Sequence, residues 1–204
     1  MRELNKIFYK ALFLIIIVFS ADAESKSVFE GKSEAKVIIK VFSSLTCPAC
    51  ANFHSKIYSQ LKIDFIDEGI IRFEHHPFPL DLAALNAEII LRCHVDNSKR
   101  FELLGKIYEK QSMWAVGSDI NKINDSIKKI GSQFGLGGGE MDRCLENDKS
   151  QDEILNQRIE AQKKYKIGAT PTVVVNNKKY TGESDYLKFR KVIEKNLVKY
   201  GLLK

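Results

Sequence analysis

The chain has 204 residues, of which 44% are hydrophobic and 28% are charged, and its formal net charge is +6. This size and composition suit one domain of moderate size with an inserted subdomain, and they exclude a disordered chain. The lysines are scattered among acidic residues, as on solvated helix faces, and there is no basic stripe interleaved with aromatic residues and no finger motif. The composition therefore argues against a nucleic-acid-binding protein.

The first 23 residues differ from the rest of the chain. Three basic residues are followed by an unbroken apolar run at residues 11–19, which is shorter than the roughly 20 residues that span a bilayer. Ala21 and Ala23 then give small residues two apart, the spacing that a signal peptidase reads. The pattern predicts a signal peptide at residues 1–23, cleaved after Ala23, and export to the periplasm. A retained membrane anchor and a buried helix are the alternatives.

The chain contains four cysteines, Cys47, Cys50, Cys93 and Cys144. The first two are separated by only two residues, whereas the others lie far apart in the sequence. In an oxidising compartment an even number of cysteines favours disulfides over a structural metal site.

The residues after the predicted leader have the pattern of a βαβ unit. Residues 37–42 (VIIKVF) form a short apolar, β-branched run, which is typical of a buried strand. A turn follows at residues 43–46, and residues 49 to about 63 carry apolar side chains three or four apart, as in a helix. Residues 70–75 (IIRFEH) predict a second strand, and we expect it to lie parallel to the first.

The second half of the chain begins with helices and ends with a hairpin and a helix. From residue 81 to about 165 the signals are helical, with no strand among them. Residues 172–175 and 178–181 then predict two strands joined by a tight turn at Asn176 and Asn177, because asparagine tolerates positive φ. A final amphipathic helix is expected at residues 184–199.

This order of elements predicts an α/β protein with the thioredoxin fold and an inserted α-helical domain. We expect the thioredoxin-fold domain at residues 28–80 and 166–204, and the inserted helical domain at residues 81–165. The insertion follows the second principal strand of the fold.

The segment Cys47-Pro48-Ala49-Cys50 lies at the predicted join between strand and helix. Proline has no N–H and a preset φ, so Pro48 fits the first position of a helix and Cys47 becomes its cap. Unpaired backbone N–H groups and the positive end of the helix dipole then stabilise a thiolate at Cys47. Cys50 lies one turn inward and is less exposed. This placement predicts that Cys47 attacks and Cys50 resolves in a redox-active disulfide.

Two other kinds of site share this cysteine spacing. Cysteines with two residues between them bind zinc or copper, and His54, four residues after Cys50 on the same helical face, is a candidate third ligand. Structural zinc requires four ligands, however, and the chain has no second close pair. A purely structural disulfide is the other alternative. We therefore expect no metal and no cofactor, and we expect His54 to be a packing or hydrogen-bonding residue.

Thr170-Pro171 immediately precedes a predicted strand in the second half of the fold. Thioredoxin-like proteins place a cis proline here, facing the active-site disulfide. Such a proline exposes backbone groups that can pair with an extended substrate by strand addition. We also expect the Thr170 hydroxyl to hydrogen-bond the Cys47 sulfur. An ordinary trans proline in a turn is the alternative.

Three segments together resemble a known family. Residues 44–54 (SLTCPACANFH) are similar to the active-site segment of bacterial DsbA-like thiol–disulfide oxidoreductases. Residues 76–81 (HPFPLD) resemble the segment after their second strand, and residues 168–172 (GATPT) resemble their cis-proline loop. The resemblance covers about residues 28 to 200. It implies that Cys93 and Cys144 form a structural disulfide, as in the branch with a second cysteine pair, with two free buried thiols as the alternative.

The chain departs from this family at two positions. Many members carry His or Tyr where this chain has Ala49, a position that tunes the redox potential. Many also carry a buried acid six residues before the first active-site cysteine, and here that residue is Val41. A proton relay through that acid is absent, the neighbouring Lys40 is not an obvious substitute, and water is one candidate carrier of the proton.

The resemblance implies a monomeric, exported oxidase that forms disulfides in unfolded or reduced exported proteins. A substrate thiolate would attack the Cys47–Cys50 disulfide, and a membrane partner resembling the quinone-linked DsbB proteins would reoxidise the enzyme. One alternative is a disulfide reductase or isomerase. A second, from another class, is a periplasmic metal-binding chaperone that uses Cys47, Cys50 and His54, and a third is a non-catalytic exported interaction domain.

Overall fold

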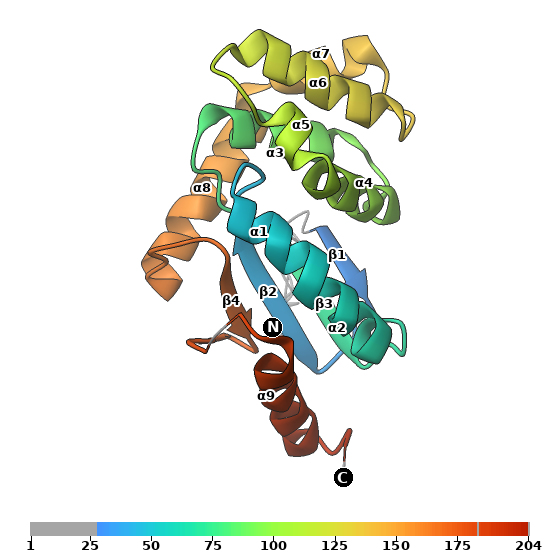
Figure 1. Ribbon diagram of the computed structural model, residues 1–204, viewed down its shortest axis with the longest axis vertical. Coiled ribbons are helices and arrows are strands. Elements are labelled where there is room, and N and C mark those ends of the chain that lie inside the picture. The colour runs from blue at the N-terminus through green and yellow to red at the C-terminus, as the bar shows by residue number, and fades with distance from the viewer. Residues whose placement is uncertain (1–27, 183, 204) are drawn as a thin grey trace, which may run out of the picture.

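The computed structural model describes residues 28–182 and 184–203 (Figure 1). The predicted signal peptide at residues 1–23 lies outside the described residues. Within them, no helix combines the length and the apolar character needed to cross a bilayer.

A five-stranded mixed sheet forms the centre of the thioredoxin domain, in the order β1-β3-β2-β4-β5. Its strands are β1 (Val28–Gly31), β2 (Val37–Ser43), β3 (Ile71–Pro77), β4 (Thr172–Val175) and β5 (Lys178–Lys179). As predicted, β2 and β3 are parallel, and the other neighbours are antiparallel. The first of these strands was not predicted, because four residues that include Glu30 and Gly31 give no strand pattern of their own.

The predicted turn between the last two strands is confirmed. Asn176 and Asn177 have φ values of 44° and 69°, which asparagine adopts more readily than most residues. The Asn176 side chain also accepts a hydrogen bond from the backbone N–H of Ile38 at 2.7 Å, so the turn is tied to β2. The second strand of this hairpin is shorter than the predicted range of residues 178–181, because β5 ends at Lys179.

One long helix connects β2 to β3 and lies in front of the sheet in Figure 1. Its segments are α1 (Pro48–Phe53), a π-helical turn (His54–Tyr58), α2 (Ser59–Leu61) and a second π-helical turn (Lys62–Ile66). It begins at Pro48, with Cys47 as the cap, as the cysteine motif predicts, and it ends three residues after the predicted end. The side chains of Phe53, Ile57 and Leu61 are buried on one face, as the apolar spacing indicates.

Six helices lie between β3 and β4 in the sequence. They are α3 (Leu82–Cys93), α4 (Asn97–Glu109), α5 (Gln111–Trp114), α6 (Ile120–Ser132), α7 (Gly138–Leu145) and α8 (Asp148–Tyr165). In Figure 1 most of them gather at one end of the sheet, while α8 returns along its side. A disulfide joins Cys93 in α3 to Cys144 in α7, with their Cα atoms 5.9 Å apart.

These elements confirm the predicted thioredoxin fold with an α-helical insertion. The chain ends with α9 (Tyr186–Lys199), close to the predicted range. Helix α8 begins six residues before the apolar periodicity at Ile154, because Asn147 caps it by accepting from the N–H of Ser150 at 3.1 Å. The exact domain boundaries at residues 80/81 and 165/166 stay predictions.

Candidate active site

The two cysteines of the CxxC motif lie between the end of β2 and the first turn of α1. Cys47 has an extended backbone, with φ −79° and ψ 117°, and Pro48 after it opens the helix. Cys47 is partly exposed, whereas Cys50 is only 2% exposed. Both thiols are free, so the structure shows the dithiol state. An attacking molecule reaches the sulfur of Cys47 and not that of Cys50.

Hydrogen bonds fasten the loop before Cys47 to the start of the helical insertion. The Thr46 hydroxyl donates to the Asp81 carboxylate at 2.7 Å. The other oxygen of that carboxylate accepts from the N–H of Ala84 at 2.7 Å and caps α3. The Ser44 hydroxyl accepts from the N–H of Leu80 at 3.3 Å. The loop is therefore positioned by both parts of the fold.

Gln111 is a residue of this site that the sequence did not reveal. It lies in the short helix α5, and its amide nitrogen donates to the carbonyls of Leu45 at 2.7 Å and Cys47 at 3.1 Å. Only 8% of the residue is exposed. A single glutamine in a helical stretch carries no recognisable signal, because its contact partners lie more than sixty residues away in the sequence.

Thr170 and Pro171 lie against the Cys47 sulfur. The Thr170–Pro171 peptide bond is cis. The Cys47 thiol donates to the Thr170 carbonyl, with 3.4 Å between sulfur and oxygen. The expected contact was with the hydroxyl instead, and that oxygen is buried without a hydrogen-bond partner among the described residues. The hydroxyl is therefore available to donate to a thiolate.

The two thiols have opposite tendencies to ionise. Burial opposes ionisation of Cys47, but the Thr170 hydroxyl, the Cys50 side chain and the N–H groups of Cys50 and Ala49 favour the thiolate, and together they lower the pKa of Cys47. Burial raises the pKa of Cys50 to about 12. Cys47 is therefore the thiol of the pair that ionises more readily, and Cys50 is the one that keeps its proton.

Comparisons with known proteins agree with this geometry. A family model described as thioredoxin matches residues 23–195. Disulfide bond formation protein D of Bacillus subtilis is 30% identical over 176 residues, which cover 82% of this chain and 75% of that protein. The chain belongs to the thioredoxin family, among the DsbA-like disulfide oxidoreductases.

Further relatives and solved structures extend the comparison. A putative protein-disulfide oxidoreductase of Rickettsia bellii is 30% identical over 146 residues, and the chain spans about half the length of this and the other curated rickettsial relatives. The crystal structure of Wolbachia pipientis alpha-DsbA1 is similar in fold, with a TM-score of 0.76, 24% identity, and coverage of 85% of this chain and 94% of that one.

The other predicted residues of this DsbA-like site occupy different surroundings. Ala49 is exposed beside Cys47. His54 is half-buried, and its ring stacks on Tyr58 with 4.4 Å between ring centroids. Val41 is 2% exposed on β2 and belongs to the apolar core. Among the described residues, no three His, Cys, Asp or Glu side chains are grouped as metal ligands.

The lowered pKa of Cys47 predicts its reactivity with pH. We expect iodoacetamide to alkylate the reduced protein more slowly as the pH is lowered. The midpoint of this decrease should lie below the ordinary thiol pKa of 9.0. The Cys47 thiolate also stabilises the folded reduced protein, because its pKa is lower in the folded state than in the unfolded state. This contribution is complete at pH values above the ordinary thiol pKa, and it is lost as the pH falls through the pKa of Cys47.

The matched variant for this measurement is Thr170→Val, which removes the hydroxyl and keeps the side-chain shape. It should move the midpoint upward. A native midpoint at or above the ordinary value would contradict the lowered pKa.

Proposed function

We propose that this chain is an exported thiol–disulfide oxidoreductase that introduces disulfides into secreted or envelope proteins through Cys47 and Cys50. The main support is the asymmetry of the two sulfurs. Cys47 is accessible, lies at a helix N-terminus and has a lowered pKa, whereas Cys50 is buried and has a pKa raised to about 12. This is the arrangement that disulfide donation requires.

The reaction proceeds by two exchanges. A substrate thiolate attacks the Cys47 sulfur, the Cys47–Cys50 bond breaks, and the electron pair passes to the Cys50 sulfur, which takes up a proton. A second substrate thiol loses its proton and attacks the substrate sulfur in the mixed disulfide, and Cys47 leaves as a thiolate. The substrate loses two electrons and the protein disulfide gains them.

The lowered pKa of Cys47 favours oxidation of the substrate over its reduction. Stabilising the thiolate stabilises the reduced protein, so the disulfide becomes a stronger oxidant, by about 30 mV for each 1.4 kcal/mol. A stabilised thiolate is also a good leaving group in the second exchange. Ala49, exposed between the cysteines, adds no ionisable group to this balance.

A groove beside Pro171 offers a place for an unfolded substrate. It has a volume of about 500 Å³ and is lined by residues of α1 and of the start of α9, including Ala49, Phe53 and Leu187. An extended chain laid along this groove passes Cys47 and can pair with the backbone next to Pro171. We propose reduced exported proteins as substrates, and a membrane quinone-linked protein resembling DsbB as the reoxidant.

The decisive experiment is a redox titration together with two activity assays. We expect the oxidised protein to convert a reduced dithiol peptide to its disulfide stoichiometrically, and to have a reduction potential above the approximately −270 mV of thioredoxin. Strong refolding of scrambled ribonuclease with a potential at or below that value would favour the isomerase alternative. Failure to exchange with any dithiol would rule out both functions.

A further inference from the structure

A buried charged cluster lies on β3 and α3, outside the set of residues that the exchange reaction uses. His75 and Glu88 are each only 2% exposed. The His75 Nε2 atom is 2.8 Å from one Glu88 carboxylate oxygen, and the Arg92 Nε atom donates to the other oxygen at 2.8 Å. Burying charged groups is costly even when they are paired. A cluster of this kind therefore calls for a functional explanation.

The cluster lies directly behind the resolving cysteine. His75 is paired with Val41 in the parallel register of β3 and β2. Both residues line a small cavity of about 10 Å³ together with Cys50, His54 and Tyr108. That volume is about the space of one water molecule. His75 and Val41 therefore border the buried thiol of Cys50 from two neighbouring strands.

Exchange at Cys50 requires a proton partner. Burial favours the neutral thiol of Cys50, so a thiolate released there must gain a proton, and a thiol that attacks must lose one. The Thr170 hydroxyl favours ionisation of both sulfurs as a hydrogen-bond donor, and the helix N-terminus lies at Cys47. Neither of them takes up the proton that Cys50 releases. We propose that His75, held in position by Glu88, is the residue that exchanges this proton with Cys50 through the cavity.

The proposal rests on the proposed function and completes its proton balance. When substrate attacks Cys47 and the disulfide bond breaks, the proton on Nδ1 of the His75 imidazolium passes to the Cys50 thiolate, directly or through one water. When Cys50 attacks a mixed disulfide on Cys47, its proton returns to Nδ1. Glu88 accepts from Nε2–H throughout, so Nδ1 is the nitrogen that can change its protonation.

Glu88 is suited to this supporting role. Burial opposes its charge, but His75 and Arg92 outweigh that effect and lower the pKa of Glu88 to about 2. Its carboxylate therefore stays ionised and stabilises the imidazolium, as the third group of a nucleophile–base pair does. Arg92 places a second positive charge beside this carboxylate, and that charge further favours the ionised form of Glu88.

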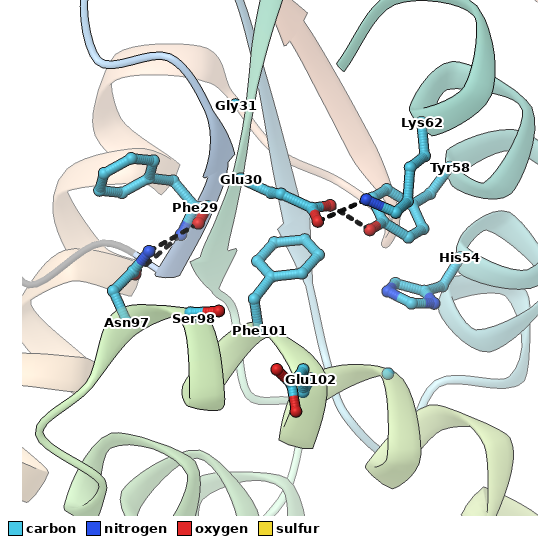
Figure 2. Close-up of a pocket in the computed structure, with 11 residues that line it drawn as sticks. Phe29, Glu30, Gly31, His54, Tyr58, Lys62, Asn97, Ser98, Phe101 and Glu102 are labelled. Carbon is cyan, nitrogen blue, oxygen red and sulfur yellow. Dashed lines mark hydrogen bonds and ion pairs between the residues drawn. The ribbon is translucent and has the colours of Figure 1, made fainter. Parts of the chain in front are cut away.

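A second histidine connects the cavity to solvent. His54 lines both the cavity and an open pocket of about 440 Å³ between β1, the long helix and α4. Figure 2 shows its ring projecting into this pocket, with Phe101 and Glu30 across from it. The Nε2 atom of His54 is buried without a hydrogen bond within the described structure. A neutral imidazole there can pass a proton between the pocket and the cavity.

Titratable and charged groups lie near His75 on four neighbouring elements. Glu88 and Arg92 lie on α3, Cys50 on α1, His54 on the π-helical turn and Tyr108 on α4. Burial raises the pKa of Tyr108 well above its ordinary value and lowers that of His54 to about 4. Of the side chains that line the cavity, His75 is the one whose ring is held by a carboxylate through Nε2, which leaves its other nitrogen to exchange a proton.

The test follows the attack of Cys50 directly. Reduced protein is mixed with excess glutathione disulfide and quenched in acid, and mass spectrometry separates the dithiol, mixed-disulfide and disulfide forms. We expect His75→Gln to slow the decay of the mixed disulfide about 100-fold near neutral pH, the lower end of the range for acid–base catalysis. Formation of the mixed disulfide at Cys47 should stay unchanged.

Two further variants separate proton exchange from a structural role. His76→Gln alters the neighbouring histidine, which contacts Glu74 and does not line the cavity, and it should behave like the native protein. Val41→Glu combined with His75→Gln places an acid in the same cavity and should recover at least about tenfold of the lost rate, because a carboxylate can then exchange the proton.

A pH profile keeps the proposal testable even if His75→Gln does not fold. In the native protein the rate of Cys50 attack should level off with rising pH, whereas hydroxide-dependent removal of the proton gives about a tenfold increase per pH unit. A native rate that keeps rising in this way, or an unchanged rate in folded His75→Gln, overturns the role of His75 while leaving exchange at Cys47 intact. A native protein that forms no mixed disulfide contradicts the proposed function instead.

Discussion

Cys47→Ser is expected to abolish dithiol oxidation, with activity falling to the level of the assay without protein. The serine hydroxyl cannot form a disulfide, and Cys50, at 2% exposure, cannot replace Cys47 as the attacked sulfur. Cys50→Ala should have a different result, because Cys47 then keeps its thiolate and loses its resolving partner. Mixed disulfides between Cys47 and substrate should accumulate and survive non-reducing electrophoresis.

The two variants act as controls for each other. Each leaves one thiol at the site, so a general loss of folding or of free thiols would affect both alike. The measurement is the yield of substrate-linked protein after incubation with a reduced dithiol peptide, followed by mass spectrometry of the adduct. Activity in Cys47→Ser, or equal trapping in Cys47→Ser and Cys50→Ala, would contradict the assignment of attack to Cys47.

The local part of this site could be read from the sequence. Pro48 fixes the start of the helix because of its own geometry, so the order of Cys47 outside and Cys50 inside follows without any distant contact. The turn at Asn176 and Asn177 is local in the same sense. The structure has both features where the sequence placed them.

The remaining features depend on contacts between distant segments. Strand β1 exists through its pairing with β3, and Gln111 reaches the active-site loop only because α5 packs against it. The pairing of His75 with Glu88 joins a strand to a helix. The Cys47 thiol donates to the carbonyl of Thr170 and not to its hydroxyl. Which of the two oxygens lies near the sulfur depends on the backbone conformation, and residue type alone does not reveal it. Such contacts have no periodicity or motif.

Removing the disulfide between Cys93 and Cys144 is expected to give the largest loss of stability. The two cysteines are 51 residues apart in the sequence. Without the disulfide the unfolded chain gains conformational entropy, which for a loop of that length lowers the free energy of the unfolded state by about 4 kcal/mol. Both side chains are partly exposed, so the double substitution Cys93→Ala/Cys144→Ala leaves little buried cavity to add to this cost. The free energy of unfolding should therefore fall by about that amount.

Urea denaturation monitored by circular dichroism measures this loss, with native and variant proteins both compared in the Cys47–Cys50 oxidised form. The disulfide joins α3 to α7 within the insertion, and none of the hydrogen bonds that position the Cys47 loop comes from either cysteine. The rate of exchange at Cys47 should therefore stay within about twofold of the native rate while the folded state persists. An unchanged denaturation midpoint would show that the helices of the insertion hold together without the covalent link. A large loss of exchange activity in the folded variant would mean instead that the insertion controls the geometry of Cys47.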